Sequence, residues 1–237
     1  MILRRLPVAL LSATVLISLS VSVASAATQT TASPQTLYAA ALKAGHAQRS
    51  VHWASRATSG GTVIAMVCDV ARTSGIQRIS YRDAVGSGTA TVMILDGDAY
   101  LRGDAFTLTE FMGFKALAAA KYAGAWIEIP KANPHFAAVA AGVTLRSAID
   151  QVEMVTPLRA LPDTFVHRQK VLAIAGEAPG STPAEVHLYA RPSAPHLPVG
   201  AVSKTTGAAT SIFFSRWNER VALSRPAHAV LITRTGL

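Results

Sequence analysis

Apolar and polar residues alternate along several short stretches separated by turn signals, which limits this chain to folds built on an antiparallel sheet. A pair typical of two-residue hairpin turns, Asp96-Gly97, lies between two such stretches, and the backbone of that turn needs positive φ. Residues 51–102 are therefore expected to form an antiparallel meander. Its predicted strands are Val51–Arg56, Val63–Val70, Ile76–Arg82, Thr89–Leu95 and Asp98–Arg102.

Helical spacing replaces this alternation at the start and in the middle of the chain. The first predicted helix begins at Pro34, a residue suited to a first helical turn, and runs to about Gln48. A second helix is expected over 108–122, with Thr107 or Thr109 as its N-cap. The next predicted elements are a short strand over 126–130, a weak helix over 133–141 and a helix over 144–151.

The last third of the chain returns to a period of two. A loop bracketed by Pro157 and Pro162 is expected to precede it. The order of helix, strands, helices and strands contains no βαβ alternation, so the predicted fold class is α+β, with helices packed on one side of an antiparallel sheet. The strands predicted in this third are 166–175, 185–190, 199–205 and 210–217.

The first 26 residues have the three-part layout of a cleaved secretory signal. Arg4 and Arg5 precede an apolar run from Leu6 to Val23, and Ala24-Ser25-Ala26 supplies small residues for the peptidase. An uncleaved membrane anchor is the alternative, although the run is short and rich in serine for a membrane span. We therefore expect residues 1–26 to be a signal peptide. Residues 27–237 are expected to form one domain that is secreted or extracytoplasmic, in the cell envelope.

Composition narrows the partners of such a domain. Half of the residues are hydrophobic and 15% are charged, which is enough for a sizeable core. Cys68 is the only cysteine, so no intramolecular disulfide and no lipid anchor at the cleavage point are expected. The net charge of +9, or +7 without Arg4 and Arg5, suits peripheral contact with an anionic membrane. The cations are scattered and do not interleave with aromatic residues, so nucleic acid is not an expected partner.

Motifs for catalysis and metal binding are missing from the sequence. It contains no HExxH, no Gly-x-Ser-x-Gly, no phosphate-binding loop and no paired-cysteine metal site. Asp96 and Asp98 flank a turn glycine, and turn chemistry explains them better than calcium binding. We therefore expect a protein that is not an enzyme and that needs neither a cofactor nor a metal. A hydrolase is the least favoured alternative.

Two predicted strands contain consecutive apolar residues, Val92–Leu95 and Ile212–Phe214. A sheet with one face in water should alternate, so both faces at these places are expected to be dry. A thick core or a homodimer would explain this pattern. The other explanation is a cavity for an apolar ligand on a concave face.

Several short motifs, taken in order, resemble the LolA-like lipoprotein-localisation fold, and most closely its actinobacterial LppX/LprG-type envelope proteins. The resemblance implies an unclosed antiparallel half-barrel, an incomplete β-barrel, whose concave face is covered by helices around a cavity for acyl chains. It also implies a role in carrying lipids or lipoproteins, or in binding a protein partner as a stress sensor. The matching residues are Met93–Gly103, Gly124–Pro130, Thr144-Leu145, His196-Leu197-Pro198 and Phe214–Glu219.

These observations together predict a secreted, non-enzymatic carrier that holds a lipid or other apolar small molecule between the half-barrel and its helices. The alternative is an envelope interaction or stress-sensor module whose apolar surface contacts a protein partner. The candidate cavity residues are chosen from periodicity. They are Trp53, Met66, Val92, Ile94, Leu101, Phe111, Leu145, Ile149, Leu188 and Phe214.

Overall fold

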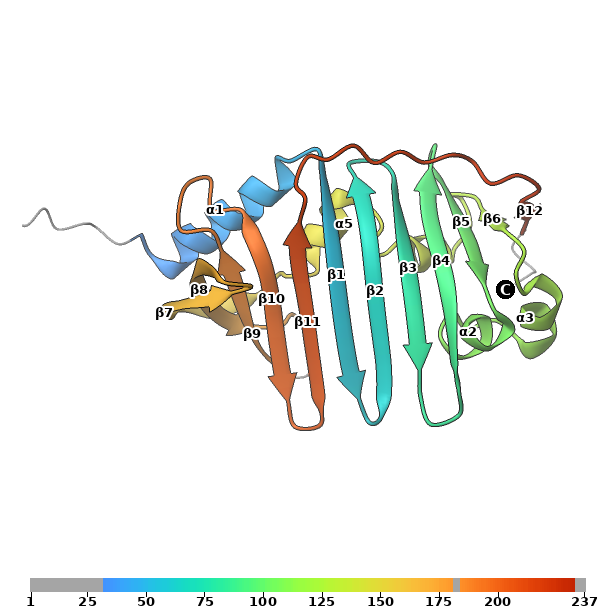
Figure 1. Cartoon of the computed structure of the whole chain (residues 1–237), viewed down its shortest axis with the longest axis horizontal. Helices are drawn as coiled ribbons and strands as arrows, with labels where there is room; N and C mark the ends of the chain where they lie inside the picture. The colour runs from blue at the N-terminus through green and yellow to red at the C-terminus, as the bar shows by residue number, and fades with distance from the viewer. Residues whose placement is uncertain (1–31, 181–183, 233–237) are drawn as a thin grey trace, which may run out of the picture. The chain divides into compact units, whose positions relative to one another are not determined.

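One sheet of twelve strands runs through the computed structural model, which describes residues 32–180 and 184–232 (Figure 1). The segment predicted to be a signal peptide, residues 1–26, lies outside the described residues. The strand order is β12-β6-β5-β4-β3-β2-β1-β11-β10-β9-β8-β7. The strands are β1 (Ser50–Ser59), β2 (Thr62–Ala71), β3 (Gly75–Arg82), β4 (Ser87–Leu95), β5 (Asp98–Gly103), β6 (Ile127–Ile129), β7 (Val155–Val166), β8 (Gln169–Glu177), β9 (Glu185–Ala190), β10 (Pro198–Thr205), β11 (Ala208–Ser215) and β12 (Val230–Leu231).

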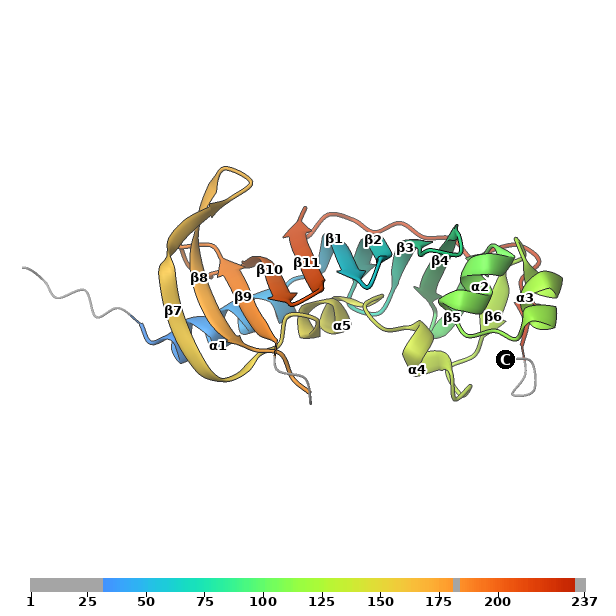
Figure 2. The same cartoon turned by 90° about the horizontal axis from the view of Figure 1, so that it is seen from below.

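The sheet is curved and unclosed, as the view along its strands shows (Figure 2). Its strands pair antiparallel throughout except for β12, which pairs parallel with β6. Helices α1, α4 and α5 lie along the concave face (Figure 2). This arrangement confirms the predicted α+β half-barrel with helices covering its concave face. The helices are α1 (Pro34–His46), α2 (Ala105–Glu110), α3 (Ala116–Tyr122), α4 (Phe136–Val139) and α5 (Leu145–Asp150).

The hairpin predicted at Asp96-Gly97 joins β4 to β5. Both turn residues have positive φ, 54° and 90°, as a two-residue turn of this hand requires. The register places Val92 opposite Leu101 and Met93 opposite Tyr100, so the two apolar pairs point to opposite faces of the sheet. This register determines which side chains of the meander reach the concave face.

The predicted helix over 108–122 is wrong, because two shorter helices replace it. Gly113 has a φ of 75° and separates α2 from α3. The N-cap of α2 is Asp104 rather than a threonine, and its Oδ1 accepts a hydrogen bond from the Thr107 backbone N–H at 2.7 Å. Thr109 lies inside the helix, where its hydroxyl donates to the Ala105 carbonyl.

The loop predicted around Pro157 and Pro162 is also wrong, since both prolines lie inside β7. This strand is the last of the sheet, and a proline is tolerated at an edge because no neighbour needs its missing N–H. Strand β8 begins at Gln169 rather than at 166. His167 and Arg168 have positive φ and form the turn between β7 and β8.

Two further differences concern the weakest sequence signals. The weak helix expected over 133–141 shrinks to the four residues of α4. The two-residue strand β12 was not predicted at all, because two residues are too few to show a period. It fastens the end of the C-terminal segment, residues 216–229, which runs past one end of the strands from β11 to β12 (Figure 1).

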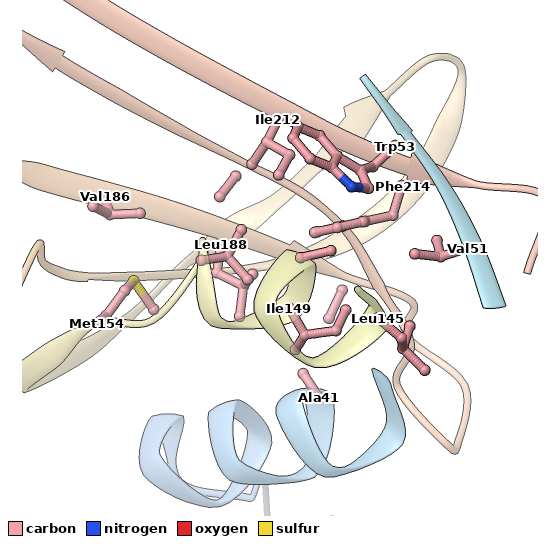
Figure 3. Packing of buried hydrophobic residues seen from close by; sticks show 14 of the residues in the cluster. Ala41, Val51, Trp53, Leu145, Ile149, Met154, Val186, Leu188, Ile212 and Phe214 are labelled. Carbon is pink, nitrogen blue, oxygen red and sulfur yellow. The ribbon is translucent and has the colours of Figure 1, made fainter. Parts of the chain in front are cut away.

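Two clusters of buried side chains fill the concave side. In the first, Leu145 and Ile149 of α5 pack between α1 and the sheet (Figure 3). Gly45 lets α1 approach this closely, since a Cβ there would lie 3.0 Å from Ile149 Cδ1. The second cluster lies over β3–β6 and includes Val92, Ile94 and Leu101. The helices are thus held by apolar contact with the concave face.

Candidate apolar cavity on the concave face

A cavity of about 250 Å³ lies between the concave face of β1–β4 and the chain that connects α4 to α5. It is lined mainly by apolar and aromatic side chains, the lining typical of small-molecule sites. The lining residues are Trp53, Met66, Gln77, Ile79, Val92, Phe111, Met112, Ala138, Val139, Ala141, Gly142 and Gln151.

Strand alternation builds the floor of this cavity. Trp53 of β1 lies opposite Cys68, Cys68 opposite Gln77 of β3, and Gln77 opposite Val92 of β4, so all four residues share one face. Trp53 is 2% exposed and its indole N–H donates to the Gly142 carbonyl at 3.2 Å. This hydrogen bond joins the floor to the wall.

The wall comes from segments without regular strand pairing. Gly142 has a φ of 75°, and a Cβ there would lie 3.1 Å from the Trp53 ring, so glycine allows the chain to approach the indole closely. Phe111, the C-cap of α2, also lines the cavity wall. Ala138 and Ala141 are exposed and form the rim of the cavity.

The structure brings together four of the ten residues expected from periodicity, namely Trp53, Met66, Val92 and Phe111, around this cavity. The other six lie in the buried clusters. Ile94 and Leu101 belong to the cluster over β3–β6. The remaining four, Leu145, Ile149, Leu188 and Phe214, pack in the cluster around α5 (Figure 3).

Sequence reasoning missed other lining residues. Ile79 lies on the same period-two face of β3 as the rest of the floor, so a complete reading of that period finds it. Gln77 also follows this period but was missed because it is not apolar. The stretch from Ala138 to Gly142 carries no signal of its own, since its place depends on how α4 and α5 pack.

A second cavity of about 330 Å³ lies further along the concave face, over β9–β11. It shares Gln151, which follows α5, with the first cavity. Val186, Ala201 and Ile212 supply its apolar floor. The concave face therefore has hollows on both sides of the end of α5.

A larger cavity, about 680 Å³, lies on the opposite face under the C-terminal segment and has a different character. Asp69 accepts hydrogen bonds from His52 at 2.8 Å and from Arg216 at 3.0 Å, and Arg78 lies 4.0 Å away. Arg220 and Arg225 also line it. A charged lining of this kind is unsuited to an uncharged apolar ligand, so size alone does not identify the apolar site.

Ionisable groups suited to catalysis do not gather in the apolar cavity. The Cys68 thiol lies under its floor, and burial raises the pKa of this thiol, which keeps it in the unreactive protonated form. Across residues 32–180 and 184–232, no three histidine, cysteine or acidic side chains come close enough together to hold a metal ion. The helices within these ranges include none with the length and apolar character needed to cross a bilayer.

Comparisons of the sequence and of the structure with known proteins identify the fold. No family model and no curated protein matches the sequence. The crystal structure of LprF from Mycobacterium bovis matches with a TM-score of 0.55 at 12% identity, over 82% of this chain and 97% of LprF. The lipoprotein LppX of Mycobacterium tuberculosis matches with a TM-score of 0.54 at 15% identity, over 81% of this chain and 98% of LppX. The chain has the LolA-like fold.

This finding confirms the fold that the ordered sequence motifs predict. At such low identity the likeness extends to the fold and not to a ligand. What the apolar cavity could bind therefore depends on its own lining residues.

Proposed function

We propose that the protein is a non-enzymatic carrier that binds a lipid or other apolar small molecule in the concave-face cavity. The observation that carries this proposal is the cavity lined by Trp53, Met66, Val92 and Phe111, open at a rim of exposed alanines. The proposed site of action is the cell envelope or the medium outside it, as the signal-like residues 1–26 imply. No step of the proposal needs a catalytic group.

Hydrocarbon burial supplies the driving force for such binding. Each CH₂ group transferred from water into an apolar site contributes about 0.8 kcal/mol, from which the cost of immobilising the ligand is subtracted. The volume of about 250 Å³ lies just below the ~300–1,000 Å³ typical of sites for drug-sized ligands. One slim chain or ring system fits this volume better than several acyl chains.

A substitution at the rim tests the proposal. Ala138→Trp places an indole at the mouth of the cavity without removing any buried contact, because Ala138 is exposed. We expect it to weaken binding of the neutral fluorescent probe N-phenyl-1-naphthylamine by at least tenfold, measured by titration. Mass spectrometry of an organic extract should also find lipid in the purified wild-type protein and less in the variant.

The neighbouring residue provides a matched control. Ala137 is exposed on the same helix α4 but does not line the cavity, so Ala137→Trp should bind the probe as the wild type does. Equal binding by both variants, or no probe uptake and no extracted lipid in the wild type, would contradict the carrier proposal. A polypeptide that copurifies in place of lipid would favour the interaction-module alternative.

A further inference from the structure

A single amide interrupts the apolar floor of the cavity. Gln77 is 4% exposed and lies in the middle of β3, within a row of side chains that crosses the concave face. The other members of this row carry apolar, aromatic or thiol side chains. In strand order the row contains Phe214, Trp53, Cys68, Gln77, Val92, Leu101 and Ile127.

The hydrogen-bonding capacity of this amide is largely unused by protein atoms. Gln77 Nε2 donates to Met66 Sδ at 3.4 Å, and sulfur is a weak partner. In the part of the chain that the structure describes, Gln77 Oε1 accepts no hydrogen bond. The other polar group of the floor, the Trp53 indole N–H, is already bonded to Gly142.

Any ligand that covers Gln77 removes it from water. A hydrocarbon cannot replace the hydrogen bonds that the amide then loses, whereas a hydroxyl, ester or amide group can. A charged group would be costly at this depth, because none of the described residues lining the cavity carries a charge. The surroundings of Gln77 therefore favour a polar but uncharged group.

We infer that Gln77 is a specificity-determining residue and that the ligand is an amphiphile whose uncharged oxygen function reaches the cavity floor. This inference rests on the carrier proposal and names the chemical class of its ligand. Hydrocarbon parts of the ligand contact Trp53, Val92 and Phe111, while the oxygen function exchanges hydrogen bonds with the Gln77 amide.

Competition with the fluorescent probe tests this assignment. Octane and octan-1-ol have the same chain and differ in one hydroxyl, and octanoate adds a charge. Gln77→Leu is similar in size but lacks hydrogen-bonding groups. It should shift the ratio of the dissociation constants of octan-1-ol and octane about tenfold in favour of octane, because a tenfold change corresponds to about one net hydrogen bond. Octanoate should bind the wild type more weakly than octan-1-ol.

The matched control is the same substitution at the second glutamine of the cavity. Gln151 lines the rim and is exposed, so water satisfies its amide and Gln151→Leu should leave the ratio unchanged. An unchanged ratio in Gln77→Leu, or tighter binding of octanoate than of octan-1-ol, would overturn the inference while the carrier proposal stands. If none of the compounds nor the probe binds, the carrier proposal fails and the inference fails with it.

Thermal unfolding of the unliganded variant separates specificity from a structural role. Replacing an amide that, within the described residues, is hydrogen-bonded to the Met66 sulfur should leave the melting temperature of Gln77→Leu unchanged or raised. A drop of several degrees would show that the amide holds Met66 in place, which would overturn the assignment of Gln77 to ligand recognition.

Discussion

The same strands build both faces of the sheet, but different interactions hold the segments that cover each face. Apolar contacts dominate on the concave face, and charged contacts dominate on the convex face. On the concave face, one row of residues runs through Trp53, Gln77 and Val92 and packs against helices by apolar contact. On the convex face, the adjacent row runs through His52 and Asp69, which are linked to Arg216 of the C-terminal segment by hydrogen bonds and ion pairs. Neighbouring residues of one strand thus contact the helices on one face and the C-terminal segment on the other.

This difference explains why the apolar stretch in β4 does not alternate. Val92 and Ile94 face the concave cluster, while Met93, also 3% exposed, lines the cavity under the C-terminal segment. Next to it, Tyr100 is fully buried with the Arg225 guanidinium 5.7 Å from its ring centre. Apolar side chains are buried on both faces here because a helix layer covers one face and a chain segment covers the other.

The largest effect should come from removing the anchor of the concave face. Trp53→Ala deletes a buried indole and its hydrogen bond to Gly142, and should lower the free energy of unfolding by about 3–5 kcal/mol. Urea denaturation followed by circular dichroism measures this loss. Trp126→Ala is the matched change on the convex side, where the ring is only half-buried beside the C-terminal segment. Equal losses in both variants would remove the distinction between the faces.

A smaller effect is expected at Asp104, which ties α2 to the sheet. Burial raises the pKa of this carboxyl, but backbone hydrogen bonds from Thr107 and Thr89 outweigh it and leave the pKa below its ordinary value. Asp104→Ala should cost about 0.5–2 kcal/mol near neutral pH, the usual range for a lost N-cap.

The effect of Asp104→Ala should also depend on pH. A lowered pKa in the folded state means that the carboxylate stabilises the protein above the ordinary aspartate pKa of about 4 and loses that contribution as the pH falls through the folded value. The difference between wild type and variant should therefore shrink in acid when melting temperatures are compared. Asp163→Ala is the control, because it removes an exposed carboxylate that is paired with Lys170. The difference between this variant and the wild type should not shrink in the same way. A melting-temperature difference between wild type and Asp104→Ala that grows in acid would contradict the lowered pKa of Asp104.

Much of the fold could be predicted because its strongest signals are local. Strands β1–β5 and the Asp96-Gly97 turn follow from alternation and turn chemistry alone, and α5 lies within the predicted helix over 144–151. The errors occur where tertiary position overrides local preference. Pro157 is tolerated inside β7 only because that strand has no second neighbour, and position at the sheet edge is not written in the local sequence.

The site was harder to predict than the fold. Periodicity identifies which side chains face inward, but it does not distinguish a residue at a cavity from one packed beneath a helix. Trp53 and Phe214 are partners across β1 and β11, yet only Trp53 lines the cavity. Phe214 instead packs in the cluster around α5, and which inward side chains a helix buries depends on packing between distant parts of the chain.

The smallest effect on stability should come from loosening the convex face. Asp69→Asn weakens the contacts to His52, Arg78 and Arg216, but these side chains are partly exposed and screened, so the loss should stay below about 1 kcal/mol and decrease with salt. Hydrogen exchange should nevertheless quicken at Asn218, whose N–H donates to Ser50 in wild type. Asp163→Asn should change neither quantity. A loss of unfolding free energy as large as that of Trp53→Ala would mean that charge, and not apolar contact alone, holds the structure together. Unchanged exchange at Asn218 would mean that Asp69 does not anchor the C-terminal segment.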